Sequence, residues 1–320
     1  MGLFDLALTN LVSPPILFFA LGLVAALIRS DLAVPEAVAK SLSIFLIMAI
    51  GFKGGVEMAS ASLSDAAMAI GAGILISFAL PFISFGLLRA TSRTGRVDAA
   101  AIAAHYGSIS IVTFIAASDA GNAMGLAAAG FMVAVAAAME APAIFSGLIL
   151  AGKQEGQSDR ELFREVAVNG SIVLLVGAFL IGWATGETGR EVVEPLFYDV
   201  FRGVLCIFLL DMGLVAGRGL VRQAGALQWP VILHGLYMPV IGASLGLFIA
   251  WIIGLAPGTG ALLMTLSASA SYIAVPAAMR LALPKAKPAV ALTLSLGVTF
   301  PFNLVFGIPI YFAIARAVLG

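Results

Sequence analysis

Small polar residues interrupt a long apolar run at AAHYGSISIVTFIAA, residues 103–117. Ser108 and Ser110 lie near the middle of a predicted membrane span, residues 97–118, and Gly107 before them permits backbone conformations that other residues resist. Interrupted helices are tolerated inside a membrane only where they line a cavity or are buried in protein. We therefore expect this span to be discontinuous and to contribute to a binding site.

A second run of small polar residues, SASASYIAV (267–275), lies at a similar depth in the predicted span 258–280. It contains Ser269 and Ser271, and it is followed by Pro276, which has no backbone N–H. Two opposed interrupted helices would bring unpaired N–H groups and partial positive charges toward one point. Because helix N-termini bind anions, the pattern predicts a site for a small monovalent oxyanion. The alternative is that these small residues only allow close helix packing.

A carboxylate, Glu140, lies deep in the predicted fifth span, within VAAAMEAPAIF. A charge at such a depth costs about 2.5 to 3.5 kcal/mol, so it needs a cation, a proton or a hydrogen-bond donor. The last span offers a hydroxyl and an amide oxygen near Pro301, and oxygen ligands suit a hard cation such as Na⁺. The alternative is a protonated, hydrogen-bonded structural carboxyl. The predicted Na⁺ ligands are Glu140, Thr113, Ser267, Thr299 and Asn303.

The other deep carboxylate, Asp211, is interpreted as a member of a structural ion pair with Lys40, Arg202 or Lys53, or as part of a cavity wall. The alternative is a role in substrate coupling. An intramembrane enzyme using Glu140 and Asp211 would be expected to show a nucleophile motif, a paired aspartyl motif or a metal-ligand cluster, and the sequence has none of these motifs. The interrupted helices also disfavour a passive channel. We expect a transporter without enzymatic activity and without a cofactor, with Na⁺ as the coupling ion.

The composition places the chain in a membrane. Apolar residues make up 61% of it, charged residues 11%, and the mean hydropathy is +1.09, whereas soluble domains carry about a quarter charged residues. A spanning helix needs about 20 mostly apolar residues. The expected fold is all-α, with ten spans at 10–29, 34–52, 66–88, 97–118, 121–151, 165–184, 199–217, 229–254, 258–280 and 288–318.

Lys and Arg are distributed unevenly over alternate connections. One set holds twelve, and the other holds only Lys53, Arg190 and Arg316. The positive-inside rule therefore predicts a multi-pass protein of the cell's inner (plasma) membrane with both termini outside the cytoplasm. The acidic segment 186–199 is expected to be an outward-facing loop. The N-terminus has neither a basic region nor a small-residue cleavage site, so we expect no removable signal peptide.

Features recur in the same order in the two halves of the chain. The second span, AKSLSIFLIMAIGFKGG (39–55), matches the seventh, FRGVLCIFLLDMGLVAG (201–217), in a basic residue before an Ile-Phe-Leu core and in its terminal glycines. The fourth and ninth spans share central small polar residues, and the fifth and tenth are long and interrupted by proline. Because each half has an odd number of spans, the second would insert inverted, as in many secondary transporters. The predicted organisation is a first five-helix repeat at 1–152, a cytoplasmic linker at 153–164 and a second, inverted repeat at 165–320.

Four segments carry a resemblance to a known family: IMAIGFKGGVEM (47–58), FYDVFRGVLCIFLLDMGL (197–214), SASASYIAVPAAMRLALP (267–284) and SLGVTFPFNLVFGIPIYF (295–312). Together they resemble the sodium-dependent bicarbonate transporters of the SbtA type, over nearly the whole chain. The resemblance implies ten spans in two inverted repeats, a core domain that moves against a gate domain, and a homotrimer. It also raises a PII-like protein as a cytoplasmic regulator, although the loop at 152–164 is shorter than in cyanobacterial members.

The resemblance implies binding residues at both interrupted helices. Glu140 takes the place of the carboxylate in the family's Met-Asp-Ile-Pro segment. Tyr272 departs from the family, because cyanobacterial members have an acidic residue after the serine run. This departure leaves the Na⁺ stoichiometry and the substrate open. The implied contacts of the oxyanion are Gly107, Ser108, Ile109 and Ser110 from one side, and Ser269, Ala270, Ser271 and Tyr272 from the other.

We expect Na⁺-coupled import of bicarbonate by an alternating-access, elevator-like mechanism. The alternative is Na⁺-coupled symport of another small monovalent anion, such as a monocarboxylate. Coupling has a physical reason. Moving a monovalent anion into a negative cell interior costs about 2.3 kcal/mol per 100 mV of membrane potential, and one Na⁺ that enters with it cancels this electrical cost. The formal net charge of zero gives no indication of nucleic-acid binding.

Overall fold

The computed structural model describes residues 12–59, 62–152, 170–223, 228–272, 275–276, 279, 283, 286 and 288–320. Within these residues the chain is all-helical, with 85% helix and no strand. Seven helices in this part of the chain are long and apolar enough to cross a membrane. The all-α membrane class is therefore confirmed, while the count of ten spans stays a prediction. The predicted linker at 153–164 lies outside the described residues.

The helices follow the predicted spans in order. In chain order they are α2 (Pro14–Leu27), α3 (Glu36–Met58), α4 (Leu63–Thr91), α5 (Arg96–Gly107), α6 (Ile111–Ala123), α7 (Met132–Ala138), α8 (Glu140–Ala151), α10 (Gly170–Glu194), the π-helix η1 (Pro195–Asp199), α11 (Phe201–Gln223), α12 (Trp229–Ile252), α13 (Pro257–Ala268), α15 (Pro288–Leu294), the π-helix η2 (Ser295–Thr299), α16 (Phe300–Phe302), the π-helix η3 (Asn303–Gly307) and α17 (Ile308–Leu319).

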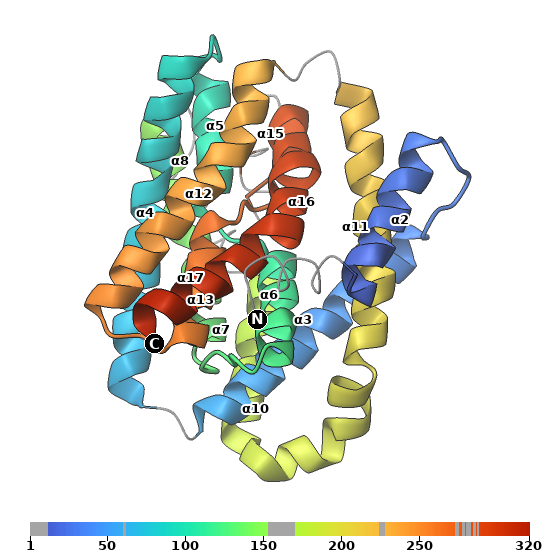
Figure 1. The fold of residues 1–320 in the computed structure, drawn as a ribbon, viewed down its shortest axis with the longest axis vertical. Coiled ribbons are helices and arrows are strands. Elements are labelled where there is room, and N and C mark those ends of the chain that lie inside the picture. Colours follow the sequence, from blue (N-terminus) through green and yellow to red (C-terminus); the bar gives the residue numbers. More distant parts are fainter. Residues whose placement is uncertain are drawn as a thin grey trace.

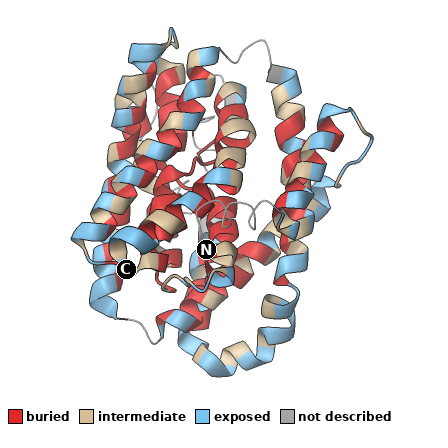
Figure 2. Cartoon of the chain, viewed as in Figure 1, coloured by how far each residue is buried: buried red, intermediate tan, exposed pale blue. Residues whose placement is uncertain are grey.

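The helices form two groups that lie side by side (Figure 1). A four-helix group comprises α2, α3, α10 and α11, in which α10 packs along α3 and α11 packs along α2. A main bundle comprises α4, α5, α8, α12, α13 and the C-terminal helices α15 to α17, while α6 and α7 contact both groups. Buried residues are concentrated between the helices of the main bundle (Figure 2).

Glycines bring the paired helices of the four-helix group into backbone contact. A Cβ atom at Gly22 of α2 would overlap the carbonyl oxygen of Leu210 on α11. A Cβ atom at Gly55 of α3 would likewise overlap the carbonyl oxygen of Phe179 on α10. Because helices in lipid associate by close packing, these small residues set the spacing within both pairs.

The predicted fifth span, residues 121–151, starts too early. α6 continues to Ala123, and α7 begins only at Met132. Gly125 has a φ of +68°, and the amide of Leu126 donates to the carbonyl of Gly121 at 2.8 Å, which ends α6 in a tight turn. The connecting residues MGLAAAGF (124–131) are themselves apolar, so hydropathy could not separate them from the helices.

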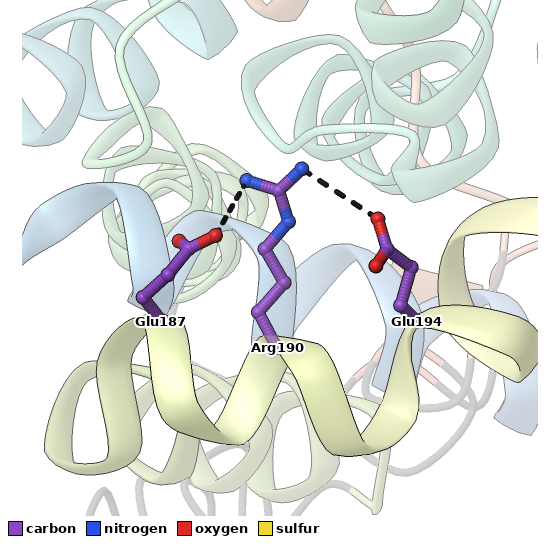
Figure 3. Close-up of polar contacts among 3 residues, drawn as sticks. All are labelled: Glu187, Arg190 and Glu194. Carbon is purple, nitrogen blue, oxygen red and sulfur yellow. Dashed lines mark ion pairs between the residues drawn. The ribbon is translucent and has the colours of Figure 1, made fainter.

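The acidic segment 186–199 was expected to be a loop, and this is wrong because the segment is helical. α10 kinks at Gly186, where φ is 55° and ψ is −142°, and then continues to Glu194, where η1 follows. Arg190 pairs with Glu187 at 3.1 Å and with Glu194 at 3.7 Å (Figure 3). Charges of opposite sign three and four residues apart support a helix, although exposed pairs contribute little stability.

The predicted ion pair of Asp211 is also wrong. Asp211 forms no ion pair among the described residues. Arg202 Nε instead donates to Asp119 Oδ1 on α6 at 2.7 Å. Lys53 Nζ lies 4.5 Å from the ring centroid of Tyr198, a cation–π contact. Arg202 therefore binds α6, and Lys53 binds η1 between α10 and α11, so neither basic side chain pairs with Asp211.

Candidate functional site

The chain leaves the helical conformation between α5 and α6. Ser108 (φ −92°, ψ 164°) and Ser110 (φ −103°, ψ 110°) are extended. The Ser110 hydroxyl caps α6, since it accepts from the Thr113 amide at 3.2 Å and from the Thr113 hydroxyl at 2.9 Å. The apolar window of Arg96–Ala123 is 100% buried, so this non-helical backbone is enclosed by protein, as a membrane requires.

Gly107 ends α5 for a packing reason that the sequence did not reveal. A Cβ atom there would overlap the ring of Pro81 in α4 and lie 2.7 Å from the carbonyl oxygen of Ser77. Pro81 leaves a gap in the hydrogen bonding of α4, and the backbone of Gly107 packs against it. Gly107 thus places the end of α5 directly on α4.

The second non-helical segment starts where α13 ends at Ala268. Ser269 is extended (φ −81°, ψ 164°), and the following residues to Tyr272 are not helical. The Ser271 hydroxyl accepts from the Val275 amide at 3.4 Å. In both segments a serine side chain therefore serves the backbone N–H groups that follow it.

Two hydrogen bonds join these non-helical segments to each other. The Ser110 amide donates to the Ser269 hydroxyl at 3.0 Å, although the two residues are 159 positions apart. The Ser271 amide donates to the carbonyl of His105 at 2.8 Å. The predicted substrate residues of the two halves therefore meet at one place in the main bundle.

Unpaired backbone donors lie at this meeting point. The amides of Ile109 and Ala270 make no hydrogen bond to any residue within the described part of the chain. Both residues are buried, at 2% and 3% exposure. A buried, unpaired N–H group costs free energy unless a ligand or water satisfies it. Two such groups, from opposite segments, are suited to an oxyanion.

Tyr272 adds a side-chain donor. Its hydroxyl is buried and has no hydrogen-bond partner of adequate geometry among the described residues, with Ser110 as a polar neighbour. A phenol presents one O–H donor and an acceptor oxygen. All eight residues predicted to contact substrate are buried: Gly107, Ser108, Ile109, Ser110, Ser269, Ala270, Ser271 and Tyr272.

Glu140 adjoins the first non-helical segment. It is the first residue of α8, directly after the interruption at Met139 between α7 and α8. The Ser108 hydroxyl donates to Glu140 Oε2 at 3.0 Å, and Glu140 is only 8% exposed. No Lys or Arg in the described residues forms an ion pair with it. Its charge is therefore compensated by a hydroxyl alone, which leaves coordination capacity for a cation.

The C-terminal π-helices hold Thr299 and Asn303 beside the same segments. Thr299 Oγ1 is 2.7 Å from the Tyr106 hydroxyl, next to Gly107, while Asn303 Nδ2 donates to the carbonyl of Ala268 at 2.8 Å. The Tyr311 hydroxyl donates to Asn303 Oδ1 at 2.9 Å. π-Helical turns occur frequently at functional sites, and here they bring both polar residues to the ends of α5 and α13.

The five predicted Na⁺ ligands are thus near the interrupted helices but are not joined in one hydrogen-bonded cluster. Glu140 contacts Ser108, and Ser267 donates to the carbonyl of Leu263 in its own helix at 2.8 Å. Thr113 contacts Ser110, the cap of α6. Thr299 instead contacts Tyr106 in α5, and Asn303 contacts the carbonyl of Ala268 at the end of α13. Among the described residues, no group of three or more His, Cys, Asp and Glu could hold a metal ion, so any cation here would rely on hydroxyl, amide and carbonyl oxygens.

Several residues of the site were missed from the sequence. The hydroxyl of Tyr106 anchors Thr299, and Ser77 donates to the carbonyl of Met139, next to Glu140. The Nδ1 of His105 contacts the carbonyl of Ala101 at 2.7 Å, but its buried Nε2 has no partner within the described chain. Ser77 and Ser84 are the two serines in the apolar run of α4, and this polarity was the available signal for Ser77. Nothing local marks the Tyr106–Thr299 contact, which links residues 193 positions apart.

A comparison with protein families decides between the classes of protein that such a site could serve. A model of the Na⁺-dependent bicarbonate transporter superfamily matches residues 14–316, almost the entire chain. The chain belongs to this superfamily. A comparison with curated proteins finds no match. Membership in the Na⁺-dependent bicarbonate transporter superfamily confirms the resemblance carried by the sequence, and it favours transport over enzymatic catalysis.

Proposed function

We propose that the protein is a secondary active transporter that imports bicarbonate together with Na⁺. The carrying observation is the meeting of the two non-helical segments, where Ser110 contacts Ser269 and unpaired amides remain at Ile109 and Ala270. Backbone N–H groups and hydroxyls can bind a monovalent anion without a fixed positive side chain. Weak, side-chain-neutral binding of this kind also lets the anion leave on the other side of the membrane.

Na⁺ coupling is supported by the environment of Glu140. The carboxylate is buried, and among the described residues it accepts a hydrogen bond from the Ser108 hydroxyl, which belongs to the predicted substrate site. A cation bound to Glu140 would therefore favour the arrangement of Ser108 that the anion contacts, and the anion would favour the cation in return. Such reciprocity is the thermodynamic basis of coupled binding. In this proposal Na⁺ also uses oxygens of Thr113, Ser267, Thr299 and Asn303.

The packing supports the inverted repeat. In an inverted repeat, α2 would correspond to α10 and α3 to α11. The α2–α11 pair would then be equivalent to the α10–α3 pair, and both pairs depend on glycines. α4 and α12 also correspond, since each contains an internal proline, Pro81 or Pro239, and packs on an interrupted helix. We propose that the four-helix group is the gate and the main bundle the core, and that an elevator-like movement of the core provides alternating access.

The decisive experiment is uptake of labelled bicarbonate into proteoliposomes. We expect uptake to rise steeply with external Na⁺ and to be stimulated by an interior-negative potential only if more than one Na⁺ accompanies each anion. K⁺ or choline in place of Na⁺ is the control. Uptake that is equally fast in choline would remove the coupling.

The transported anion is tested by competition. Tyr272 stands where an acidic residue is expected in the family, so an organic monocarboxylate is the second candidate substrate. Bicarbonate should compete with the labelled substrate more strongly than acetate, pyruvate or nitrate at equal concentration. Stronger competition by acetate or pyruvate would favour the monocarboxylate, and the Na⁺ coupling would stand.

The assembly and orientation are further parts of the proposal. The distribution of Lys and Arg favours both termini outside the cytoplasm, in the inner (plasma) membrane. A homotrimer and a PII-like cytoplasmic regulator follow from the family resemblance alone. Mass photometry of the purified protein would measure the number of subunits.

A further inference from the structure

We propose that a cavity between α11 and the α15–η2 segment binds a phosphate group carried by an anionic ligand. The cavity has a volume of about 340 Å³. One wall belongs to α11, in the four-helix group, and the other to α15 and η2, in the main bundle. It is separate from the meeting point of the non-helical segments, because it shares no lining residue with that site.

Two arginines give the cavity its charge. Arg218 and Arg222 lie four residues apart on α11, so their side chains share one face of the helix. Arg218 Nη2 donates to the carbonyl of Leu32 at 2.8 Å, which fixes its guanidinium group while leaving other N–H donors available. Arg222 has no hydrogen-bond or ion-pair partner among the described residues. Among the described residues, no Asp or Glu lines the cavity.

The facing wall is polar at one point and otherwise apolar. Thr293 supplies a hydroxyl, and this residue is only 7% exposed. A Cβ atom at Gly219 would lie 3.4 Å from Thr293 Oγ1, so the glycine on α11 leaves room beside this hydroxyl. Leu292 and Leu296 line the same wall. A ligand that fills the cavity therefore has an anionic group and an apolar part.

The two guanidinium groups favour a phosphate group. Guanidinium groups bind phosphate oxygens through paired, charge-assisted hydrogen bonds, and two of them can share one tetrahedral group. The phosphate could come from an anionic phospholipid or from a soluble phosphate ester. In either case the ligand would contact α11 and α15 together and so link the two helix groups.

The test measures binding to the full-length purified protein in neutral detergent, by titration of the thermal unfolding midpoint. The lipid arm uses dioctanoyl phosphatidylglycerol, with dioctanoyl phosphatidylcholine as its zwitterionic control. The soluble arm uses glycerol 3-phosphate and inorganic phosphate at constant ionic strength. Stabilisation by phosphatidylglycerol alone identifies a lipid, and stabilisation by the soluble phosphates identifies a soluble ester.

Variants assign the binding to the cavity. Arg218→Gln/Arg222→Gln should weaken the binding at least tenfold. Arg222→Gln alone, which leaves the Arg218–Leu32 contact in place, should weaken it several-fold without changing the midpoint of the unliganded protein. The matched control is Arg93→Gln/Arg316→Gln, which removes the same charge outside the cavity. No stabilisation in either arm, or equal loss in the control, overturns the proposal. Because the readout is binding, its failure is distinguishable from failure of Na⁺-coupled transport.

Discussion

At the scale of single residues, the contact between Ser108 and Glu140 joins the predicted anion site to the predicted cation site. A buried carboxylate with one hydroxyl donor is incompletely satisfied. Without a basic partner among the described residues, it needs a cation or a proton when the site is filled. Its function can therefore be separated from its structural role by a substitution of equal size.

We predict that Glu140→Gln abolishes the Na⁺ dependence of uptake while the protein still folds. The amide keeps a hydrogen-bond acceptor for Ser108 but removes the charge, so the unfolding free energy should change by no more than about 1 kcal/mol. Labelled uptake as a function of Na⁺ measures the first effect, and thermal unfolding the second. Glu191→Gln, on the exposed helix after Gly186, is the control. An unchanged half-saturation by Na⁺ in Glu140→Gln would place the cation elsewhere.

Tyr272 provides a second test at this scale. Because its hydroxyl has no partner within the described chain, Tyr272→Phe should leave the unfolding midpoint unchanged or raise it. If the hydroxyl contacts the anion, the KM for substrate should rise about tenfold, as expected for one lost hydrogen bond of about 1.4 kcal/mol. Tyr311→Phe is the matched control, since it removes a hydroxyl that donates to Asn303 and should cost about 1 kcal/mol of stability. An unchanged KM in Tyr272→Phe would remove this residue from the site.

At the scale of helices, the end of α5 is positioned by its contact with α4. We predict that Gly107→Ala destabilises the protein by about 1–3 kcal/mol and impairs uptake, because the added methyl group would overlap Pro81 and push α5 away. Gly86→Ala, in α4 itself, is the control, since a Cβ atom there meets nothing within 4 Å and alanine favours helix. Thermal unfolding of both variants checks the prediction. Equal midpoints for the two would show that the close approach of α5 to α4 has no energetic role.

The helical elements were also the part that the sequence predicted best. Apolar runs gave the order of the helices, and small polar residues near Ser108 and Ser269 marked where α5 and α13 end. Hydropathy failed where a turn is itself apolar, as after Ala123, and where a helix is charged, as around Arg190. In both places local hydrogen bonds and ion pairs decide the conformation, and an average over a window does not contain them.

The candidate site was predictable only in part for a different reason. The serines stand out as polar residues in an apolar run, so their burial and proximity could be anticipated. The partners that fix Thr299, Asn303 and Glu140 depend on contacts between residues far apart in the chain, and on π-helical turns that rotate side chains by an amount no local pattern reveals. The eight substrate residues and the five Na⁺ ligands stay predictions.

At the scale of the whole molecule, the pair Asp119–Arg202 connects α6 with α11 of the four-helix group. If the two groups move during transport, holding these positions together should stop uptake. We predict that Asp119→Cys/Arg202→Cys, in a Cys206→Ser background, loses uptake after treatment with a short bis-methanethiosulfonate cross-linker and regains it after reduction. Each single cysteine variant under the same treatment is the control. Full uptake by the completely cross-linked protein would exclude relative movement at this contact.

The burial of every residue from 99 to 117, in α5, α6 and their connection, has a consequence for how the protein is made. Some hydrogen-bond partners of this segment come from the second half of the chain: the carbonyl of His105 accepts from the Ser271 amide, the Ser110 amide donates to the Ser269 hydroxyl, and the Tyr106 hydroxyl contacts Thr299. Until the second half of the chain has been synthesised, these groups would lack the partners that they have in the folded protein. A nascent chain at this stage is therefore a natural client for insertion chaperones and a target for quality-control proteases until its last helices arrive.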